Sequence, residues 1–146
     1  MSGNVKISKR SALTWDPEFR LRVKDIEEHL ERLTKGGVKI ANKTSFMLCL
    51  AVGFELKKTR PRPPRRSDAV VLSYFNDQDK ALMSSIALAH SRDHTVLLDE
   101  DKVYDIIEEY AAGGLEVLVT QMEKGADFSN YLTKLLFTSL KNQNHT

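Results

Sequence analysis

Residues 44–54, Thr-Ser-Phe-Met-Leu-Cys-Leu-Ala-Val-Gly-Phe, form a run that is apolar on nearly every face of a helix. Its length of about three helical turns, and the Thr or Ser that can cap its start, favour a buried helix over a strand. Gly53 within it indicates close approach of another element, because glycine costs ~1 kcal/mol relative to alanine in a helix interior. Cys49, the single cysteine, is expected to be an inert buried thiol.

Helices are also predicted before this run. Asp16-Pro17-Glu18 is a typical helix start, with a capping carboxylate followed by proline at the first helical position. Apolar residues then recur at steps of three and four and form one stripe, which predicts an amphipathic helix that ends at Gly36-Gly37. The members of the stripe are Phe19, Val23, Ile26, Leu30 and Leu33.

Further elements are predicted after the run. Residues 70–72 predict a short strand, and Asn76 or Asp77 caps a helix that carries Met83 and Ile86 on its inner face. Residues 95–98 suggest a second short strand or an extended connection. Asp99-Glu100-Asp101 opens an acidic first helical turn, as the helix dipole favours, and Gly113-Gly114 is expected to interrupt that helix. Asp127 caps a last helix.

The expected fold is therefore mostly α, a single compact helical domain of five to six helices with one or two short strands. We expect a polar, irregular arm over residues 1–15, the helical domain over 16–141 and a polar tail over 142–146. A chain of 146 residues can bury a core without disulfides or metal. No signal-peptide pattern and no run of ~20 apolar residues is present, so the expectation is a soluble, cytoplasmic protein without membrane contact.

Charge is divided sharply at residue 66. Residues 1–66 hold 16 Lys and Arg against 7 Asp and Glu, whereas residues 67–146 hold 6 against 13. The net charge of +2 therefore conceals a dipolar molecule. A basic half suits a polyanion such as DNA or RNA, and an acidic half suits a basic protein partner.

An Arg/Pro segment over residues 57–66 is the best candidate site. Its prolines exclude a central helix and predict an exposed, extended connection whose cations could neutralise several phosphates. The alternatives are a solvated linker or a surface for an acidic protein. The predicted nucleic-acid contacts are Lys39, Lys43, Lys57, Lys58, Arg60, Arg62, Arg65 and Arg66.

Carboxylates cluster in the acidic half, where they form either a solvated helix face or a docking surface for a larger protein or a second copy of the chain. The residues predicted to dock a partner are Asp101, Asp105, Glu108 and Glu109. Enzyme signatures are absent: there is no phosphate loop, dinucleotide fingerprint or cysteine pair. His90 and His94 flank Asp93, but a helix end there argues against a site, so no catalytic residue, metal or cofactor is predicted.

Several blocks resemble a family of small bacterial proteins encoded beside DNA phosphorothioation defence genes, the dnd system-associated proteins. They are residues 44–54, 75–82, 86–89, 97–100 and 106–118. The order is also similar to the small E component of those gene clusters, an oligomeric protein with a ribbon–helix–helix-like segment that is associated with DNA binding. By that likeness, residues 38–40 would be the ribbon strand. The Arg/Pro segment and the acidic half depart from the pattern.

The resemblance implies a role in anti-phage defence or its regulation and supplies no catalytic residues. Combined with the charge split, it predicts a non-catalytic accessory protein that binds DNA through its basic half. The alternative is an adaptor or structural oligomer of a defence complex, with basic half against acidic half and no direct DNA binding. Charge reversal of Arg62 and Arg65 separates the two hypotheses.

Overall fold

The computed structural model describes residues 5–15, 20–33, 41–61, 67–125 and positions 130, 131, 133–135 and 137. The mostly helical class expected from the sequence is confirmed. In chain order the elements are β1 (Ala12–Trp15), η1 (Arg20–Arg22), α1 (Val23–Leu33), α2 (Asn42–Glu55), β2 (Ser67–Val71), η2 (Leu72–Tyr74), α3 (Asp77–Ser91), η3 (His94–Leu98) and α4 (Glu100–Glu123).

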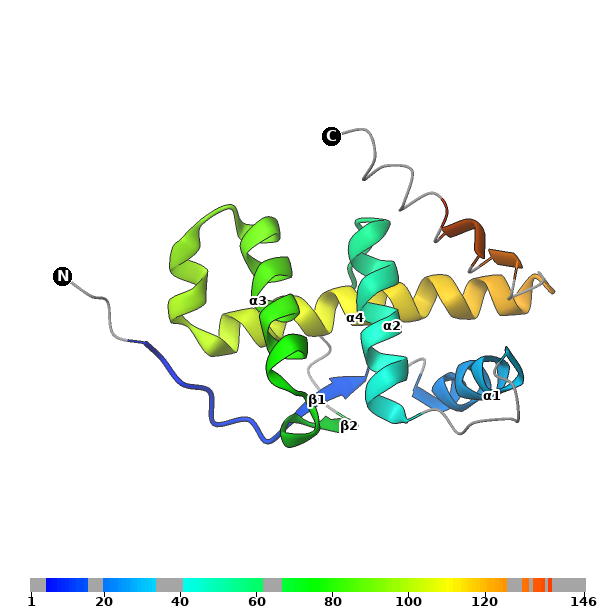
Figure 1. Cartoon of the computed structure of the whole chain (residues 1–146), viewed down its shortest axis with the longest axis horizontal. Coiled ribbons are helices and arrows are strands. Elements are labelled where there is room, and N and C mark those ends of the chain that lie inside the picture. The colour runs from blue at the N-terminus through cyan, green and yellow to red at the C-terminus, as the bar shows by residue number, and fades with distance from the viewer. Residues whose placement is uncertain are drawn as a thin grey trace.

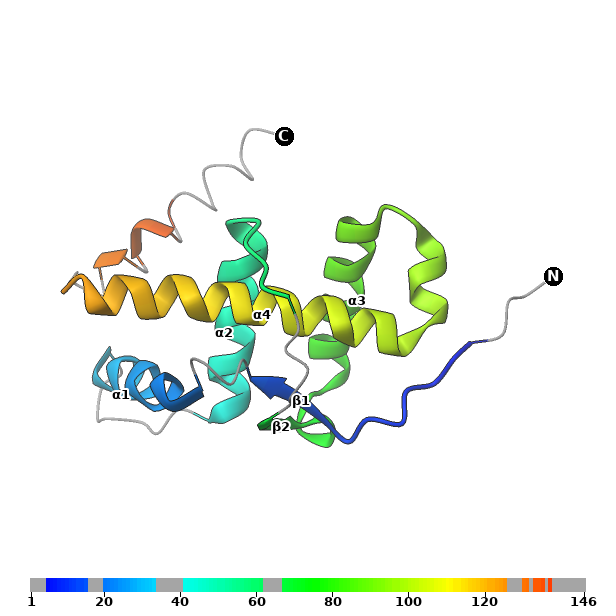
Figure 2. The same cartoon turned by 180° about the vertical axis from the view of Figure 1, so that it is seen from behind.

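Helix α4 runs along the longest axis of the molecule and organises the other elements. Helices α2 and α3 cross it on the same side, while α1 lies beside its C-terminal half (Figures 1 and 2). The apolar run of α2 is buried as expected, with Phe46, Cys49 and Leu50 fully enclosed. Phe46 also makes edge-on contacts with Trp15 and Phe75, at ring-centroid distances of 5.2 and 5.8 Å, which join β1, α2 and the start of α3 in one core.

Strands β1 and β2 pair antiparallel, with Leu13 opposite Val70 and Trp15 opposite Ser67. The expected strand near residue 70 is thus present. The expectation of an irregular arm to residue 15 is wrong at its end, because Leu13 and Trp15 are buried in the core. The alternation of Ala12–Trp15, with every second side chain inward, is that of a half-buried strand, but four residues are too few for a secure pattern.

Two further details differ from the sequence prediction. Gly113 and Gly114 lie inside the continuous helix α4 and do not interrupt it. The backbone of α2 and of the residues just after it packs directly against both glycines, at a distance that leaves no room for a side chain. Residues 94–98 form the 3₁₀ helix η3 rather than a strand. Its turn begins where the Asp93 side chain accepts a hydrogen bond from the Thr95 amide at 3.0 Å.

Helices α3 and α4 begin directly after residues whose side chains cap them. Asn76 and Asp79 form a reciprocal capping box at α3, with amide-to-oxygen distances of 2.9 and 2.8 Å, and Asp99 accepts from the Lys102 amide at α4. Helix α2 begins after Ala41, earlier than the expected Thr or Ser and without a side-chain cap. Residues 38–40 and most of the predicted last helix lie outside the described residues. Within the described parts, no helix is long and apolar enough to cross a membrane.

Candidate functional site

The predicted DNA contact Lys43 forms an internal ion pair. Its Nζ lies 2.7 Å from Oδ2 of Asp79, the capping residue of α3. The hydrogen bond from Lys43 is the main cause that lowers the pKa of Asp79. This lysine therefore ties the start of α2 to the start of α3, and its charge is balanced within the fold.

Lys58 and Arg60 share a second carboxylate, Glu116 of α4. Arg60 Nη1 donates to Glu116 Oε2 at 2.7 Å, and Lys58 Nζ lies 3.7 Å from Oε1. The Arg60 hydrogen bond lowers the pKa of Glu116, with Lys58 adding to the effect. The Arg60 amide also donates to the Glu109 carbonyl at 3.0 Å. The start of the Arg/Pro segment is thereby fastened along α4.

Lys57 differs from these neighbours. It is exposed and forms no ion pair within the described part of the chain. The remaining predicted contacts, Lys39, Arg62, Arg65 and Arg66, lie outside the described residues. Among the four predicted contacts that the structure describes, three neutralise internal carboxylates, and Lys57 is exposed without an ion pair.

The acidic residues of α4 face the chain's own basic N-terminal segment. Arg10 binds Asp101, Asp105 and Glu108 together; its Nε lies 3.5 Å from Asp101 and its Nη1 3.2 Å from Glu108. Lys6 lies beside Asp101 as well. Three of the four residues predicted to dock a partner are thus in contact with residues 6–10, and Glu109 contributes its carbonyl to Arg60.

Hydrogen bonds complete this attachment. The Lys6 amide donates to the Leu98 carbonyl, and Ser8 donates to Glu100 and Asp101. The Ser8 hydrogen bond is the main cause that lowers the pKa of Asp101. Glu108, which is buried, also accepts from the Thr14 amide and hydroxyl at 2.7 and 2.8 Å. The segment before β1 is therefore a strap across the first half of α4.

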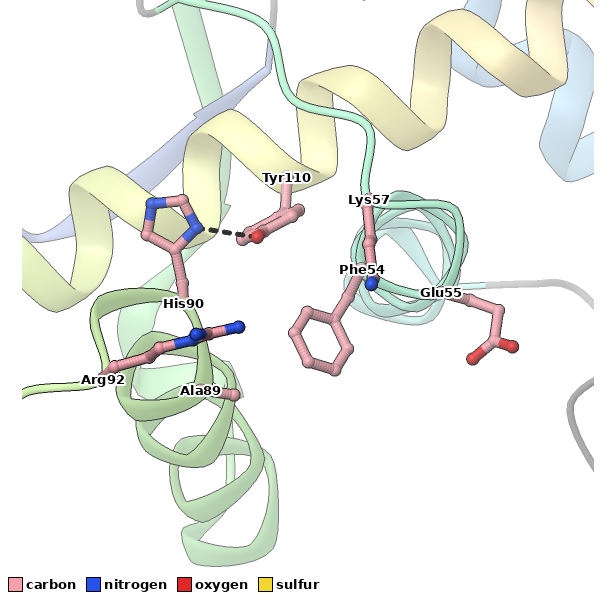
Figure 3. A pocket seen from close by; sticks show the side chains of 7 residues that line it. All are labelled: Phe54, Glu55, Lys57, Ala89, His90, Arg92 and Tyr110. Atoms are coloured by element: carbon pink, nitrogen blue, oxygen red, sulfur yellow. Dashed lines mark hydrogen bonds between the residues drawn. The ribbon is translucent and has the colours of Figure 1, made fainter. Parts of the chain in front are cut away.

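A hollow of about 530 Å³ lies between α2, α3 and α4, and the sequence reasoning did not find it. Figure 3 shows Phe54, Lys57, Arg92 and Tyr110 converging on it, while the Glu55 carboxylate points away. His90 and Ala89 complete its lining. Its side chains come from the ends of two helices and the middle of a third, so no local pattern marks it.

Aromatic contacts order the wall of this hollow. Tyr110 Oη and His90 Nδ1 are hydrogen-bonded at 2.7 Å, and the two rings meet edge to face at 5.2 Å. Phe54 packs edge-on against Tyr110 at 5.5 Å. Burial raises the pKa of Tyr110, with Glu109 adding to the effect. The side chain of His90 is thus held by Tyr110. Asp93 does not contribute to this contact, because its side chain caps the start of η3.

Lys57 and Arg92 share an unusual backbone conformation. Their φ angles of 53° and 58° place both in the left-handed region, and no other non-glycine residue among those described has a positive φ. Lys57 follows the end of α2 and Arg92 caps α3. Gly or Asn is the usual occupant of such positions. Within the same described residues, no three His, Cys, Asp or Glu side chains gather as a metal site.

In the parts of the chain that the structure describes, these observations define a mainly helical protein in which several basic side chains pair with carboxylates of α3 and α4, and in which cationic and aromatic side chains line a hollow. The chain belongs to the family described as DNA sulphur modification system-associated protein 4, which matches residues 20–146. The resemblance to dnd-associated proteins is confirmed, and the chain is thereby associated with a DNA sulphur modification system. No curated protein and no solved structure gives a significant match.

Proposed function

We propose that this chain is a non-catalytic accessory protein that binds DNA through phosphate contacts beginning at Lys57 and Arg92 and continuing along the Arg/Pro segment. The observation that carries this proposal is the convergence of these two exposed cations, from different helices, on one hollow. Neither has a carboxylate partner in the described ranges. Lys57 is also the first residue of the Arg/Pro segment, which holds Arg62, Arg65 and Arg66.

The internal ion pairs indicate which cations are available to contact DNA phosphates. Partly exposed pairs such as Lys58 with Glu116 contribute about 0–1 kcal/mol, so a phosphate competes with the carboxylate for the same lysine. A phosphate contact would, however, cost each of these paired cations its present ion pair with a carboxylate. This applies to Lys43, Lys58 and Arg60. The main phosphate contacts in this proposal are therefore Lys57, Arg62, Arg65, Arg66 and Arg92.

The test is a titration of the purified protein with duplex DNA at two salt concentrations. Phosphate neutralisation makes affinity fall steeply with salt, and the Arg62→Glu/Arg65→Glu variant should lose binding. Lys24→Glu/Lys102→Glu carries the same charge change in the first turns of α1 and α4, where Glu suits the helix dipole, and should retain most binding. Absence of binding by the wild-type protein at low salt would overturn the proposal.

A second candidate is a structural oligomer in which α4 docks the basic half of a second copy of the chain. The observation in its favour is that Asp101, Asp105 and Glu108 already hold a basic segment, the chain's own Lys6–Arg10 strap. Light scattering separates the two functions. Under the oligomer function Arg62→Glu/Arg65→Glu reduces the mass of the assembly, whereas under DNA binding it leaves that mass unchanged.

A further inference from the structure

We infer that the hollow between α2, α3 and α4 binds one unpaired nucleotide of a DNA strand. Its phosphate would lie between Lys57 and Arg92, and its base would lie against the Phe54 ring (Figure 3). This inference rests on the proposed DNA binding and adds the kind of nucleotide that the site takes.

The size and lining of the hollow fit such a ligand. Sites for small organic ligands enclose roughly 300–1,000 Å³ and combine apolar walls with a few polar groups. The hollow has about 530 Å³, two aromatic walls from Phe54 and Tyr110, and polar groups from Lys57, His90 and Arg92. The bond between His90 Nδ1 and Tyr110 Oη holds these two side chains of the lining in place.

The charge of the rim favours an anion. Each helix C-terminus contributes about half a negative charge, and two such ends, α2 and α3, lie at the rim. The full positive charges of Lys57 and Arg92 outweigh these ends, and the Glu55 carboxylate is turned away. A single phosphate supplies the missing negative charge and accepts hydrogen bonds from both side chains.

The backbone at both cations is strained in the same way. A left-handed residue with a Cβ is disfavoured, and such outliers gather at ligand sites when the surrounding structure enforces them. Arg92 is held there by its amide, which donates to the Leu88 carbonyl at 2.8 Å, and Lys57 by its amide to the Phe54 carbonyl at 3.2 Å. Both residues close the C-terminus of a helix in this conformation, and both line the hollow with a long cationic side chain.

The wall selects an unpaired base. A base inside a duplex is stacked on both faces, whereas an unpaired base exposes its face to an aromatic side chain. Phe54 is half-buried and meets Tyr110 through an edge contact, and Tyr110 is itself fixed by His90, so the wall is ordered before the ligand arrives. A preformed wall loses little conformational freedom on binding.

The experiment compares a short single strand with a blunt duplex of the same sequence, both followed by fluorescence anisotropy. Phe54→Leu keeps an apolar side chain and removes the ring. Lys57→Asn and Arg92→Asn remove a charge with a residue that tolerates the left-handed backbone. Lys124→Asn is the matched control, an exposed cation at the end of α4 away from the hollow.

We expect Phe54→Leu to weaken single-strand binding about tenfold, the usual range for loss of one stacked base, with duplex binding unchanged. Lys57→Asn and Arg92→Asn should weaken single-strand binding more than Lys124→Asn does. A folded Phe54→Leu protein with unchanged binding would overturn the inference, while duplex binding by the wild type would leave the proposed function standing.

Arg92 is exposed, so its variant gives an answer even if Phe54→Leu fails to fold. Equal effects of Arg92→Asn and Lys124→Asn on single-strand binding would overturn the inference. If the wild type binds neither DNA at low salt, the inference and the proposed function fail together.

Discussion

Gly53 of α2 and Gly114 of α4 lie backbone against backbone where the two helices cross. A Cβ atom on Gly53 would lie 2.0 Å from the Tyr110 carbonyl oxygen, and one on Gly114 would lie 1.8 Å from the Cys49 carbonyl oxygen. No side chain fits at either position. The close crossing brings the end of α2, with Phe54 and Lys57, beside Tyr110 and so forms one side of the hollow.

Gly114→Ala should strongly destabilise the protein. The added methyl group must push the backbone of α2 away from α4, and overpacking of a core typically costs 1–3 kcal/mol or more, so we expect a loss of at least about 2 kcal/mol in the free energy of unfolding. Urea denaturation measures it. Thr120→Ala, an exposed change on the same helix, should alter stability by less than about 0.5 kcal/mol. A stable Gly114→Ala protein would contradict the close crossing.

Glu108→Gln tests the strap. The amide oxygen can still accept from Thr14, but the charge opposite Arg10, whose side chain is only 12% exposed, is lost. Because Asp101 and Asp105 still face Arg10, we expect a moderate loss of about 1–3 kcal/mol in unfolding free energy.

Proteolysis gives the second measurement for this variant. The segment before β1 should be cleaved faster in Glu108→Gln than in the wild type, because the strap is held less firmly. Glu28→Gln, an exposed change on α1, is the control and should leave both stability and cleavage rate as they are. Unchanged stability and cleavage in Glu108→Gln would show that the buried pair does not hold the strap.

Acid should weaken the contact between Arg60 and α4. The Arg60 hydrogen bond lowers the pKa of Glu116 in the folded state below its ordinary 4.5. A carboxyl group with a lowered folded pKa stabilises the fold above its unfolded pKa, and this contribution is lost as pH falls through the folded pKa. Urea denaturation between neutral pH and about pH 3 should therefore show a smaller fall for Glu116→Gln than for the wild type.

A matched comparison is available for this pH series. The wild-type and Glu116→Gln curves should converge at low pH, where Glu116 is protonated in both folded and unfolded wild-type protein. Glu28→Gln should follow the wild-type curve throughout, because Glu28 is exposed and forms no ion pair within the described part of the chain. Parallel curves for Glu116→Gln and the wild type would refute the contribution of the Arg60–Glu116 pair.

Cys49 should be unreactive in the native protein. Its side chain is fully buried, and burial raises the pKa of the thiol far above its ordinary value, so the reactive thiolate is scarce and shielded. A disulfide exchange reagent at neutral pH should label the thiol only as fast as the core opens. Labelling should be immediate in denaturant and faster in Gly114→Ala than in the wild type. Rapid labelling of the native wild type would show that the core around α2 is open.

Local patterns predicted the helices well because their signals lie within a few residues. The apolar run of α2, the Asn76 cap of α3 and the acidic start of α4 were all recognised from adjacent positions. Strand β1 was missed because its four residues acquire meaning only by pairing with β2. Gly113-Gly114 predicts a helix break by local sequence alone, because the backbone that packs on it comes from residues far earlier in the chain.

The candidate site was predicted only in part. Lys57 was named from the Arg/Pro segment, but Arg92, Phe54 and Tyr110 were not, since nothing in their local sequence indicates that they meet. Their convergence depends on how α2 and α3 end against α4. The internal partners of Lys43, Lys58 and Arg60 were equally invisible, because composition counts charges without showing which of them pair.

The sequence alone determined the helical class, the main helix caps, the division of charge and the likeness to dnd-associated proteins, since each depends on residue type and short spacing. Tertiary structure decided which charges neutralise one another and which remain exposed. Arg10 meets Glu108 across 98 positions of the chain, and Arg60 meets Glu116 across 56. Electrostatic interaction falls off with distance in space, so only the packing of α2, α3 and the strap on α4 could assign these partners.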